Sequence, residues 1–178
     1  MLKNNIVVPF ADLSRTYLPL KKEISNGIQR VIDSSAFILG KEVEKFENKF
    51  SKYLRVKYCA GVSSGTSALQ MALKACNIGT DDEVITTSHS WVSTAEAISN
   101  VGAKPIFVDI DKNSFNIDPE KIKKNISKKT KCILPVHLYG NPADMKEICK
   151  IAKENKLFVI EDAAQAHGSK IGDKFCGT

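Results

Sequence analysis

The stretch VIEDAAQAHG, residues 159–168, places acidic and amide side chains directly after an apolar run. The run leads into Glu161 and Asp162, and Gln165 follows three residues after Asp162, with only alanines between them. This pattern predicts a buried strand that ends at the two carboxylates. Because an unpaired carboxylate at the end of a buried strand is costly, Asp162 needs a partner, either a helix N-terminus or a ligand.

Similar apolar runs alternate with segments of helical period from residue 58 onward. The runs predicted as strands are YCAGV (58–62), EVITT (83–87), KPIFVDI (104–110), KCILPV (131–136) and KLFVIED (156–162). Their nearly continuous apolar character is typical of parallel strands that are covered on both faces. Pro135 indicates that the fourth run ends or is interrupted there. We therefore predict an α/β fold with a mostly parallel sheet flanked by helices.

Helices are predicted between these runs and upstream of them. Two shared helical faces are formed by Leu69, Ala72, Leu73 and Cys76, and by Met145, Ile148, Cys149 and Ala152. Asp118 and Asn141 each precede a proline, and a capping side chain before proline predicts a helix start. Residues 20–34 and 43–53 also have helical periodicity. After His167, the glycine-punctuated stretch GSKIGDKFCGT predicts a hairpin or loop.

Composition limits the classes of partner. The 178 residues include 26 basic and 20 acidic side chains, a net charge of +6 that favours anionic partners. The densest basic stretch, KIKKNISKKTK (121–131), has no interleaved aromatic residues, so we expect no nucleic-acid partner. The five cysteines are scattered and odd in number, which predicts neither disulfides nor a metal site. Residues 1–13 lack a signal-peptide core and no window is long enough to span a membrane, so we expect a cytoplasmic protein without a membrane partner.

The stretch GVSSGTSALQMAL, residues 61–73, is a candidate phosphate site. A strand end, a hydroxyl-rich turn and a helix start follow one another there, which places free backbone N–H groups and the positive end of a helix dipole at one point. The stretch matches neither the dinucleotide fingerprint nor the lysine-containing P-loop, so a dinucleotide or nucleoside triphosphate is disfavoured. An ordinary capped helix is the alternative that these residues leave open.

Two further positions follow strands at the same end of the sheet. Trp91, the only tryptophan, can stack on a planar ligand, or can pack beneath a loop. Asp162 can pair with a protonated ring nitrogen while Gln165 donates to an oxygen of the same ring, or Asp162 can merely cap the turn that follows. His89 has no partners at metal-ligand spacing and is expected to be structural. A phosphate, a planar ring and a cationic nitrogen together describe pyridoxal 5′-phosphate (PLP).

Four motifs in one order resemble a known family. VSSGTSALQMAL, DEVITTSHSWVSTAEAISNVGAKPIFVDID, ILPVHLYGNPADM and VIEDAAQAHG are similar to motifs of the DegT/StrS family of PLP-dependent nucleotide-sugar aminotransferases, from about residue 9 to the end of the chain. The resemblance implies a type I aminotransferase fold, with an N-terminal helical segment (1–55) and an incomplete PLP-binding large domain (56–178), and without the family's smaller C-terminal domain.

The resemblance also implies roles for individual residues. Thr66 and Ser67 would hold the cofactor phosphate and Gly65 would allow close backbone approach. Trp91 would stack on the ring, Asp162 would pair with the pyridine nitrogen and Gln165 would bond the ring hydroxyl. The lysine that forms the Schiff base in the family lies beyond Thr178, so the chain alone is expected to be inactive.

The implied reaction transfers an amino group from glutamate or glutamine to a keto nucleotide-diphosphate sugar in amino-sugar and polysaccharide biosynthesis, by a homodimer whose active sites are completed by the neighbouring subunit. One alternative is a sugar 3-dehydratase of the same family, which has histidine in place of the lysine. The other is a truncated, non-catalytic protein that binds cofactor or pairs with a full-length subunit.

Overall fold

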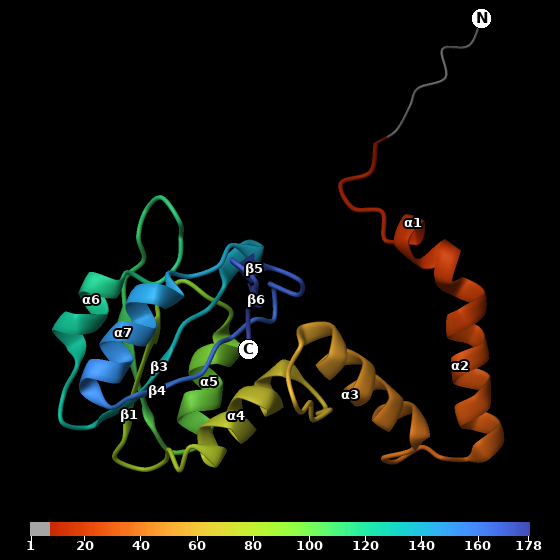
Figure 1. Ribbon diagram of the computed structural model, residues 1–178, viewed down its shortest axis with the longest axis horizontal. Coiled ribbons are helices and arrows are strands. Elements are labelled where there is room, and N and C mark those ends of the chain that lie inside the picture. The colour runs from red at the N-terminus through yellow and green to blue at the C-terminus, as the bar shows by residue number, and fades with distance from the viewer. Residues whose placement is uncertain (1–7) are drawn as a thin grey trace, which may run out of the picture. The chain divides into compact units, whose positions relative to one another are not determined.

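The computed structural model describes residues 8–178, and its chain divides into two compact units (Figure 1). The first unit comprises the described residues up to 52 together with 57–59. The second comprises residues 53–56 and 60–178. Within the described part of the chain, no helix combines the length and the apolarity that crossing a membrane requires.

Helices make up the first unit. The elements are α1 (Ser14–Tyr17), the 3-10 helix η1 (Leu18–Leu20), α2 (Lys21–Ser34) and α3 (Lys41–Leu54), whose last two residues belong to the second unit. The helices predicted at 20–34 and 43–53 are confirmed, with ends shifted by two residues or fewer. α2 ends where Ser35 adopts a left-handed backbone with φ of 51° and donates its N–H to the carbonyl of Ile32.

A parallel sheet of order β2-β1-β3-β4 forms the centre of the second unit. Its strands are β1 (Glu83–Thr87), β2 (Lys104–Val108), β3 (Thr130–Leu134) and β4 (Phe158–Val159). β3 ends before Pro135, as predicted. Beyond β4 the pairing continues through the N–H of Asp162, which donates to the carbonyl of Pro135 at 2.9 Å.

The strand predicted at residues 58–62 is wrong, because these residues have no regular secondary structure. An apolar segment becomes a strand only where its backbone groups bond to a neighbouring strand, and within residues 8–178 no strand pairs with this segment. Tyr58 is accordingly 77% exposed.

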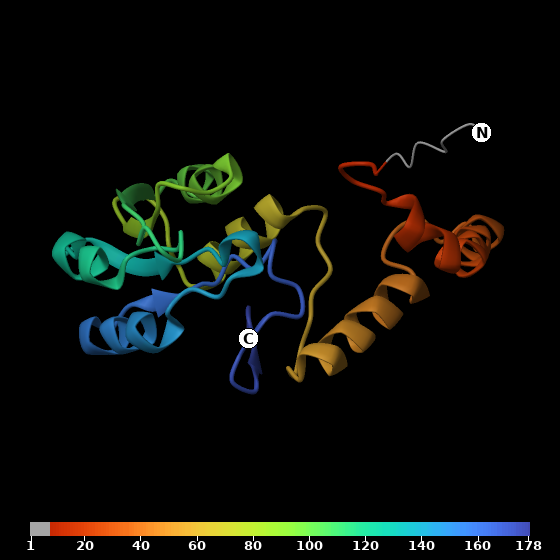
Figure 2. The same ribbon diagram turned by 90° about the horizontal axis from the view of Figure 1, so that it is seen from above.

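Alternate residues of the strands face two separate helical layers. Val84 of β1 packs with α4 (Gly65–Ala75) and α5 (Val92–Asn100), whereas its neighbour Ile85 packs with α6 (Pro119–Asn125) and α7 (Met145–Asn155). Figures 1 and 2 show the sheet between these helices. Burial on both faces explains the largely apolar sequences of the central strands β1 and β3. The outer strands β2 and β4 are less covered, because Phe107 and Phe158 are about half exposed.

Of the two helix starts predicted from a residue before proline, the one at Asp118 is confirmed and the one at Asn141 is wrong. Asp118 caps α6 by accepting a hydrogen bond from the N–H of Glu120, as expected. Asn141 does not cap a helix. Its side chain donates to the carbonyl of Ser114 in a neighbouring loop, and α7 begins four residues later with Asp144 as its cap.

The predicted helical faces agree with burial except at one position. Leu69 and Leu73 of α4 are buried, as is Ile148 of α7, but Cys149 is exposed. The predicted C-terminal hairpin is confirmed as antiparallel β5 (Lys170–Ile171) and β6 (Lys174–Phe175).

Candidate functional site

A cavity of about 260 Å³ lies beyond the carboxyl ends of β1, β3 and β4 and beside the start of α4. This is the position at which parallel α/β sheets bind ligands. Its lining consists of Gly65, Thr66, Ser90, Trp91, Ser93, Thr94, Val136, Leu138, Asp162, Ala164 and Gln165. Five of the six predicted cofactor residues are therefore brought together, and only Ser67 lies outside the lining.

Asp162 presents a carboxylate with capacity left for a ligand. Its Oδ2 accepts a hydrogen bond from the hydroxyl of Thr94 at 2.9 Å, and its Oδ1 accepts one from the N–H of Ala164 at 3.2 Å. A carboxylate offers about four acceptor positions. The bond from Ala164 is the turn cap that the sequence left open as an alternative role for Asp162. Asp162 does more than cap this turn, because it also bonds to Thr94 and lines the cavity.

Gln165 is held in one amide orientation. Its Oε1 accepts the backbone N–H of Tyr139 at 2.8 Å, so the amide nitrogen points away from that donor. No partner for this nitrogen exists among the described residues. Gln165 can therefore donate a hydrogen bond to an acceptor on a ligand.

Trp91 is 74% exposed at the N-cap of α5 and lines the cavity. The alternative that its ring packs beneath a loop is excluded by this exposure. A broad aromatic face at the mouth of a polar cavity suits contact with a planar ring.

The start of α4 has the geometry expected of an anion site. Ser64 is the N-cap and its Oγ accepts the N–H of Ser67 at 3.1 Å, while Gly65 and Thr66 occupy the first helical positions and line the cavity. Backbone N–H groups in the first turn of a helix have no intrahelical acceptor. The side-chain hydroxyl of Ser67 does not line the cavity. It lies 3.0 Å from the hydroxyl of Ser64 and 3.1 Å from that of Ser63.

Thr94 is a site residue that sequence reasoning missed, and it contacts Asp162 directly. It is 2% exposed, and its hydroxyl also lies 3.0 Å from that of Ser90. The available signal was spacing, because Thr94 follows Trp91 by three residues and lies in the first turn of the helix that Trp91 precedes. Sequence reasoning also did not find Tyr139, which acts through its backbone.

His89 has aromatic neighbours rather than metal-ligating ones. Its Nε2 lies 3.3 Å from the hydroxyl of Tyr139, and its ring lies near that of Phe115. Among residues 8–178, no group of three or more potential metal ligands occurs.

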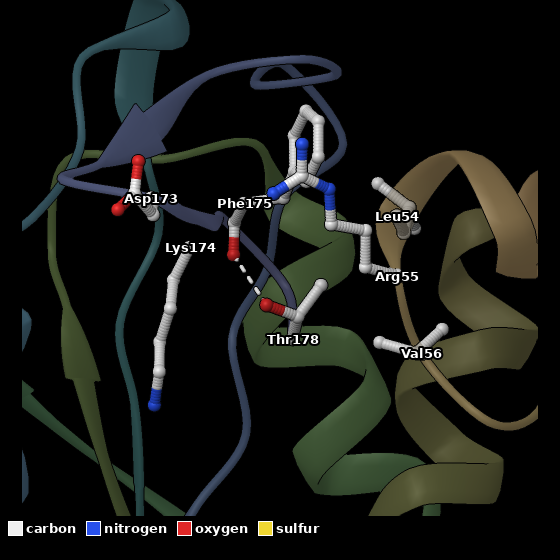
Figure 3. A pocket seen from close by; sticks show the side chains of 7 residues that line it. All are labelled: Leu54, Arg55, Val56, Asp173, Lys174, Phe175 and Thr178. Atoms are coloured by element: carbon white, nitrogen blue, oxygen red, sulfur yellow. Dashed lines mark hydrogen bonds between the residues drawn. The ribbon is translucent and has the colours of Figure 1, made fainter.

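A second cavity, of about 330 Å³, lies beside the C-terminal hairpin. It is lined by Leu54, Arg55, Val56, Asp173, Lys174, Phe175 and Thr178 (Figure 3). Figure 3 shows the Thr178 hydroxyl donating to the carbonyl of Phe175, so one polar group of the lining is already paired. This cavity contains none of the predicted site residues, and the first cavity is therefore the candidate site.

The fold and the cavity match one class of protein. The chain belongs to the DegT/DnrJ/EryC1/StrS aminotransferase family, whose model matches residues 19–178. This membership confirms the family that the four motifs indicated.

Individual relatives agree with this assignment. The chain is 45% identical to dTDP-3-amino-3,6-dideoxy-alpha-D-galactopyranose transaminase of Aneurinibacillus thermoaerophilus, over 97% of this chain and 47% of the relative. Its structure is similar to that of S. venezuelae DesV in complex with a ketimine intermediate, with a TM-score of 0.93, 42% identity and coverage of 96% of this chain and 46% of DesV.

A dehydratase is also among the similar structures. GDP-4-keto-6-deoxymannose-3-dehydratase with a trapped PLP-glutamate geminal diamine matches with a TM-score of 0.81 and 35% identity, over 86% of this chain and 42% of that protein. The chain spans about half the length of the curated relatives it matches. These similarities confirm the predicted type I PLP-dependent aminotransferase fold.

Proposed function

We propose that this chain forms the cofactor-holding part of a PLP-dependent aminotransferase, which moves an amino group from glutamate or glutamine to a keto nucleotide-diphosphate sugar in amino-sugar and polysaccharide biosynthesis. The observation that carries the proposal is the Asp162 carboxylate, which lines a cavity together with Trp91, Gln165 and the start of α4. Family membership and the sugar-transaminase relative support the reaction and the substrate class.

The donor set fits the cofactor. Asp162 supplies a carboxylate for a protonated ring nitrogen, and Gln165 supplies an amide N–H for the ring oxygen. Gly65 and Thr66 supply backbone N–H groups of the first helical turn for the phosphate. We assign Ser67 to the same group through its hydroxyl, which lies in that turn, because its N–H already donates to Ser64. The cavity lining combines the apolar side chains of Trp91, Val136 and Leu138 with a few polar groups, as is typical of cofactor sites.

When bound, PLP supplies an electron sink for the carbanion formed at the amino donor. Asp162 would keep the ring nitrogen protonated, because its negative charge favours the cationic form. Thr94 would keep this carboxylate in place by donating to Oδ2. Trp91 would cover one face of the ring and limit the access of water to it.

The Schiff-base lysine is proposed to lie beyond Thr178. Lys170 and Lys174 are exposed in the hairpin, neither lines the candidate cavity, and the Nζ of Lys170 lies 4.3 Å from the ring centroid of Phe175. These positions support surface roles for both lysines.

Further parts of the proposal concern organisation. We assign residues 1–55 to an N-terminal helical segment, of which the first seven residues lie outside the described part, and residues 56–178 to the PLP-binding domain. We also propose a cytoplasmic homodimer without nucleic-acid or membrane partners. Exposed apolar residues on α2, such as Ile24, Ile28 and Ile32, support self-association.

The proposal is tested with the protein isolated from its own organism, supplied with PLP, glutamate and a panel of dTDP-, UDP- and GDP-linked keto sugars. We expect an amino sugar and 2-oxoglutarate to form in equal amounts. Loss of a sugar hydroxyl without amino-sugar formation would instead assign the 3-dehydratase reaction. Cofactor binding without either product would show that the protein binds the cofactor but does not catalyse either reaction.

A further inference from the structure

Glu161 and Asp162 are consecutive, but their carboxylates have different partners. The Asp162 carboxylate lines the cavity, whereas Glu161 Oε2 lies 2.7 Å from Nε2 of His137 and accepts the N–H of Gly177 at 2.9 Å. Successive side chains of an extended segment point to opposite sides. Fixing Glu161 on one side therefore directs Asp162 to the other.

His137 is fully buried and its hydrogen-bond partners determine its tautomer. Its Nδ1 accepts the backbone N–H of Ala143 at 3.0 Å, so the ring hydrogen of the neutral imidazole resides on Nε2. That hydrogen is donated to Glu161. Both ring nitrogens and the Glu161 carboxylate are thus used in a single chain of hydrogen bonds.

The same histidine also bonds the backbone of Asp162. The N–H of His137 donates to the carbonyl of Asp162 at 3.1 Å, and the N–H of Asp162 donates to the carbonyl of Pro135 at 2.9 Å. His137 therefore touches Asp162 through its backbone and Glu161 through its ring. Gly177 connects this arrangement to the end of the β5–β6 hairpin.

We propose that His137 and Glu161 are positioning residues, which hold the backbone at the end of β4 so that the Asp162 carboxylate stays directed into the cavity. The inference rests on the proposed cofactor role of Asp162. An anionic side chain in a partly enclosed cavity gains from turning toward solvent when no cation is bound. The buried hydrogen-bond chain opposes that rotation before the cofactor arrives.

The test is a double-mutant cycle on the full chain, with pyridoxamine 5′-phosphate (PMP) as the probe because it binds without forming a Schiff base. Glu161→Ala should raise the Kd for PMP about tenfold, since the two residues are adjacent and coupled. In an Asp162→Asn background the same change should alter the Kd by less than about twofold. Glu161→Gln should restore most of the affinity, because its amide oxygen can accept both hydrogen bonds.

A spectroscopic measurement separates positioning from general stability. The absorbance of bound PMP is followed against pH, and Glu161→Ala should lower the pKa of its ring nitrogen, because the displaced Asp162 no longer favours the protonated form. Glu154→Ala on α7 is the matched control and should change neither the Kd nor this pKa. If Glu161→Ala does not fold, Glu161→Asp takes its place, because the shorter side chain keeps the charge but not the reach.

The outcomes are distinct. An equal loss of affinity from Glu161→Ala in both backgrounds would overturn the inference, because Glu161 would then act independently of Asp162. If Asp162→Asn alone leaves the Kd unchanged, the ring-nitrogen role fails and the inference fails with it. Weakened binding in Asp162→Asn together with unchanged binding in Glu161→Ala would overturn the inference alone.

Discussion

Asp162 and Glu161 show how two adjacent carboxylates can be placed at the end of a half-buried strand. Glu161, with 17% of its side chain exposed, pairs with a buried histidine, and Asp162 is held by Thr94 and Ala164. Each carboxylate therefore has hydrogen-bond donors that offset its loss of water. Of these two carboxylates, only that of Asp162 lines the candidate cavity. The proposed chemistry therefore depends on Asp162.

Trp91 provides a prediction at the scale of one ring. Trp91→Ala should weaken PMP binding by about two- to tenfold, the equivalent of an aromatic contact of about 0.5–1.5 kcal/mol. The melting temperature should stay unchanged, because the ring is 74% exposed and contributes little to the core. Tyr58→Ala, which removes another exposed ring outside the cavity, is the control, and equal effects of the two changes on PMP affinity would contradict the stacking role.

Cys132 gives a prediction about pH. Burial raises the pKa of this thiol from its ordinary value of 9.0 to about 12. Between these values the unfolded chain loses the proton and the folded chain keeps it, so stability decreases as pH rises. The contribution is at most about 1.4 kcal/mol of unfolding free energy per pH unit.

Urea unfolding at a series of pH values from 8 to 10.5 measures this effect. Cys132→Ala should show a shallower decline of unfolding free energy above pH 9 than the wild type. Cys149→Ala removes an exposed thiol and should keep the wild-type slope. Identical slopes in wild type and Cys132→Ala would contradict the buried thiol's role.

Which site residues could be found from sequence depends on how far apart their partners lie. Asp162 and Gln165 lie in one turn, and Gly65 and Thr66 in another, so each pair could be recognised locally. The contact of Thr94 with Asp162 spans 68 residues and that of Tyr139 with Gln165 spans 26. Such partners are brought together only by the order of strands in the sheet, which no local pattern encodes.

At the scale of elements, α4 joins the core to the site. Its N-terminus lines the cavity, and its fully buried Leu73 packs on the sheet with Val84 and Leu134. Leu73→Ala should lower the free energy of unfolding by about 2–5 kcal/mol, because it removes buried methyl groups and leaves a cavity. Chemical denaturation measures the change.

Met71→Ala is the control on the same helix. Met71 is 60% exposed, so its truncation should leave the unfolding free energy within about 0.5 kcal/mol of wild type. Equal costs for the two substitutions would contradict the assignment of the buried face.

Predictions of individual elements were wrong where contacts with distant parts of the chain determine the local structure. β1 was predicted with its observed bounds because its apolar run is buried on both faces. Residues 58–62 also form a mostly apolar run but have no pairing strand among the described residues. Asn141 precedes a proline as a helix cap would, but its side chain bonds to a loop. Composition predicts the capacity to form an element, and the neighbouring backbone determines whether it forms.

At the scale of the whole molecule, the exposed apolar residues of α2 bear on assembly. If the proposed homodimer uses this helix, Ile28→Asp should raise the dimer dissociation constant at least about tenfold, because it would bury an unpaired charge. Sedimentation velocity across a concentration series measures the change. Lys22→Asp introduces the same residue elsewhere on α2 and should have a smaller effect, and a dimer unaffected by Ile28→Asp would exclude this helix from the interface.

A titration of the full chain with PMP, comparing wild type with Asp162→Asn, tests directly whether Asp162 holds the cofactor. We predict saturable binding by the wild type and a Kd about 10- to 100-fold higher in the variant, because a charge-assisted hydrogen bond of about 1.5–3 kcal/mol is lost. Asp144→Asn, at the cap of α7, should bind as the wild type does. No saturable binding by the wild type, or equal affinities in wild type and Asp162→Asn, would contradict the claim that this cavity holds the cofactor through Asp162.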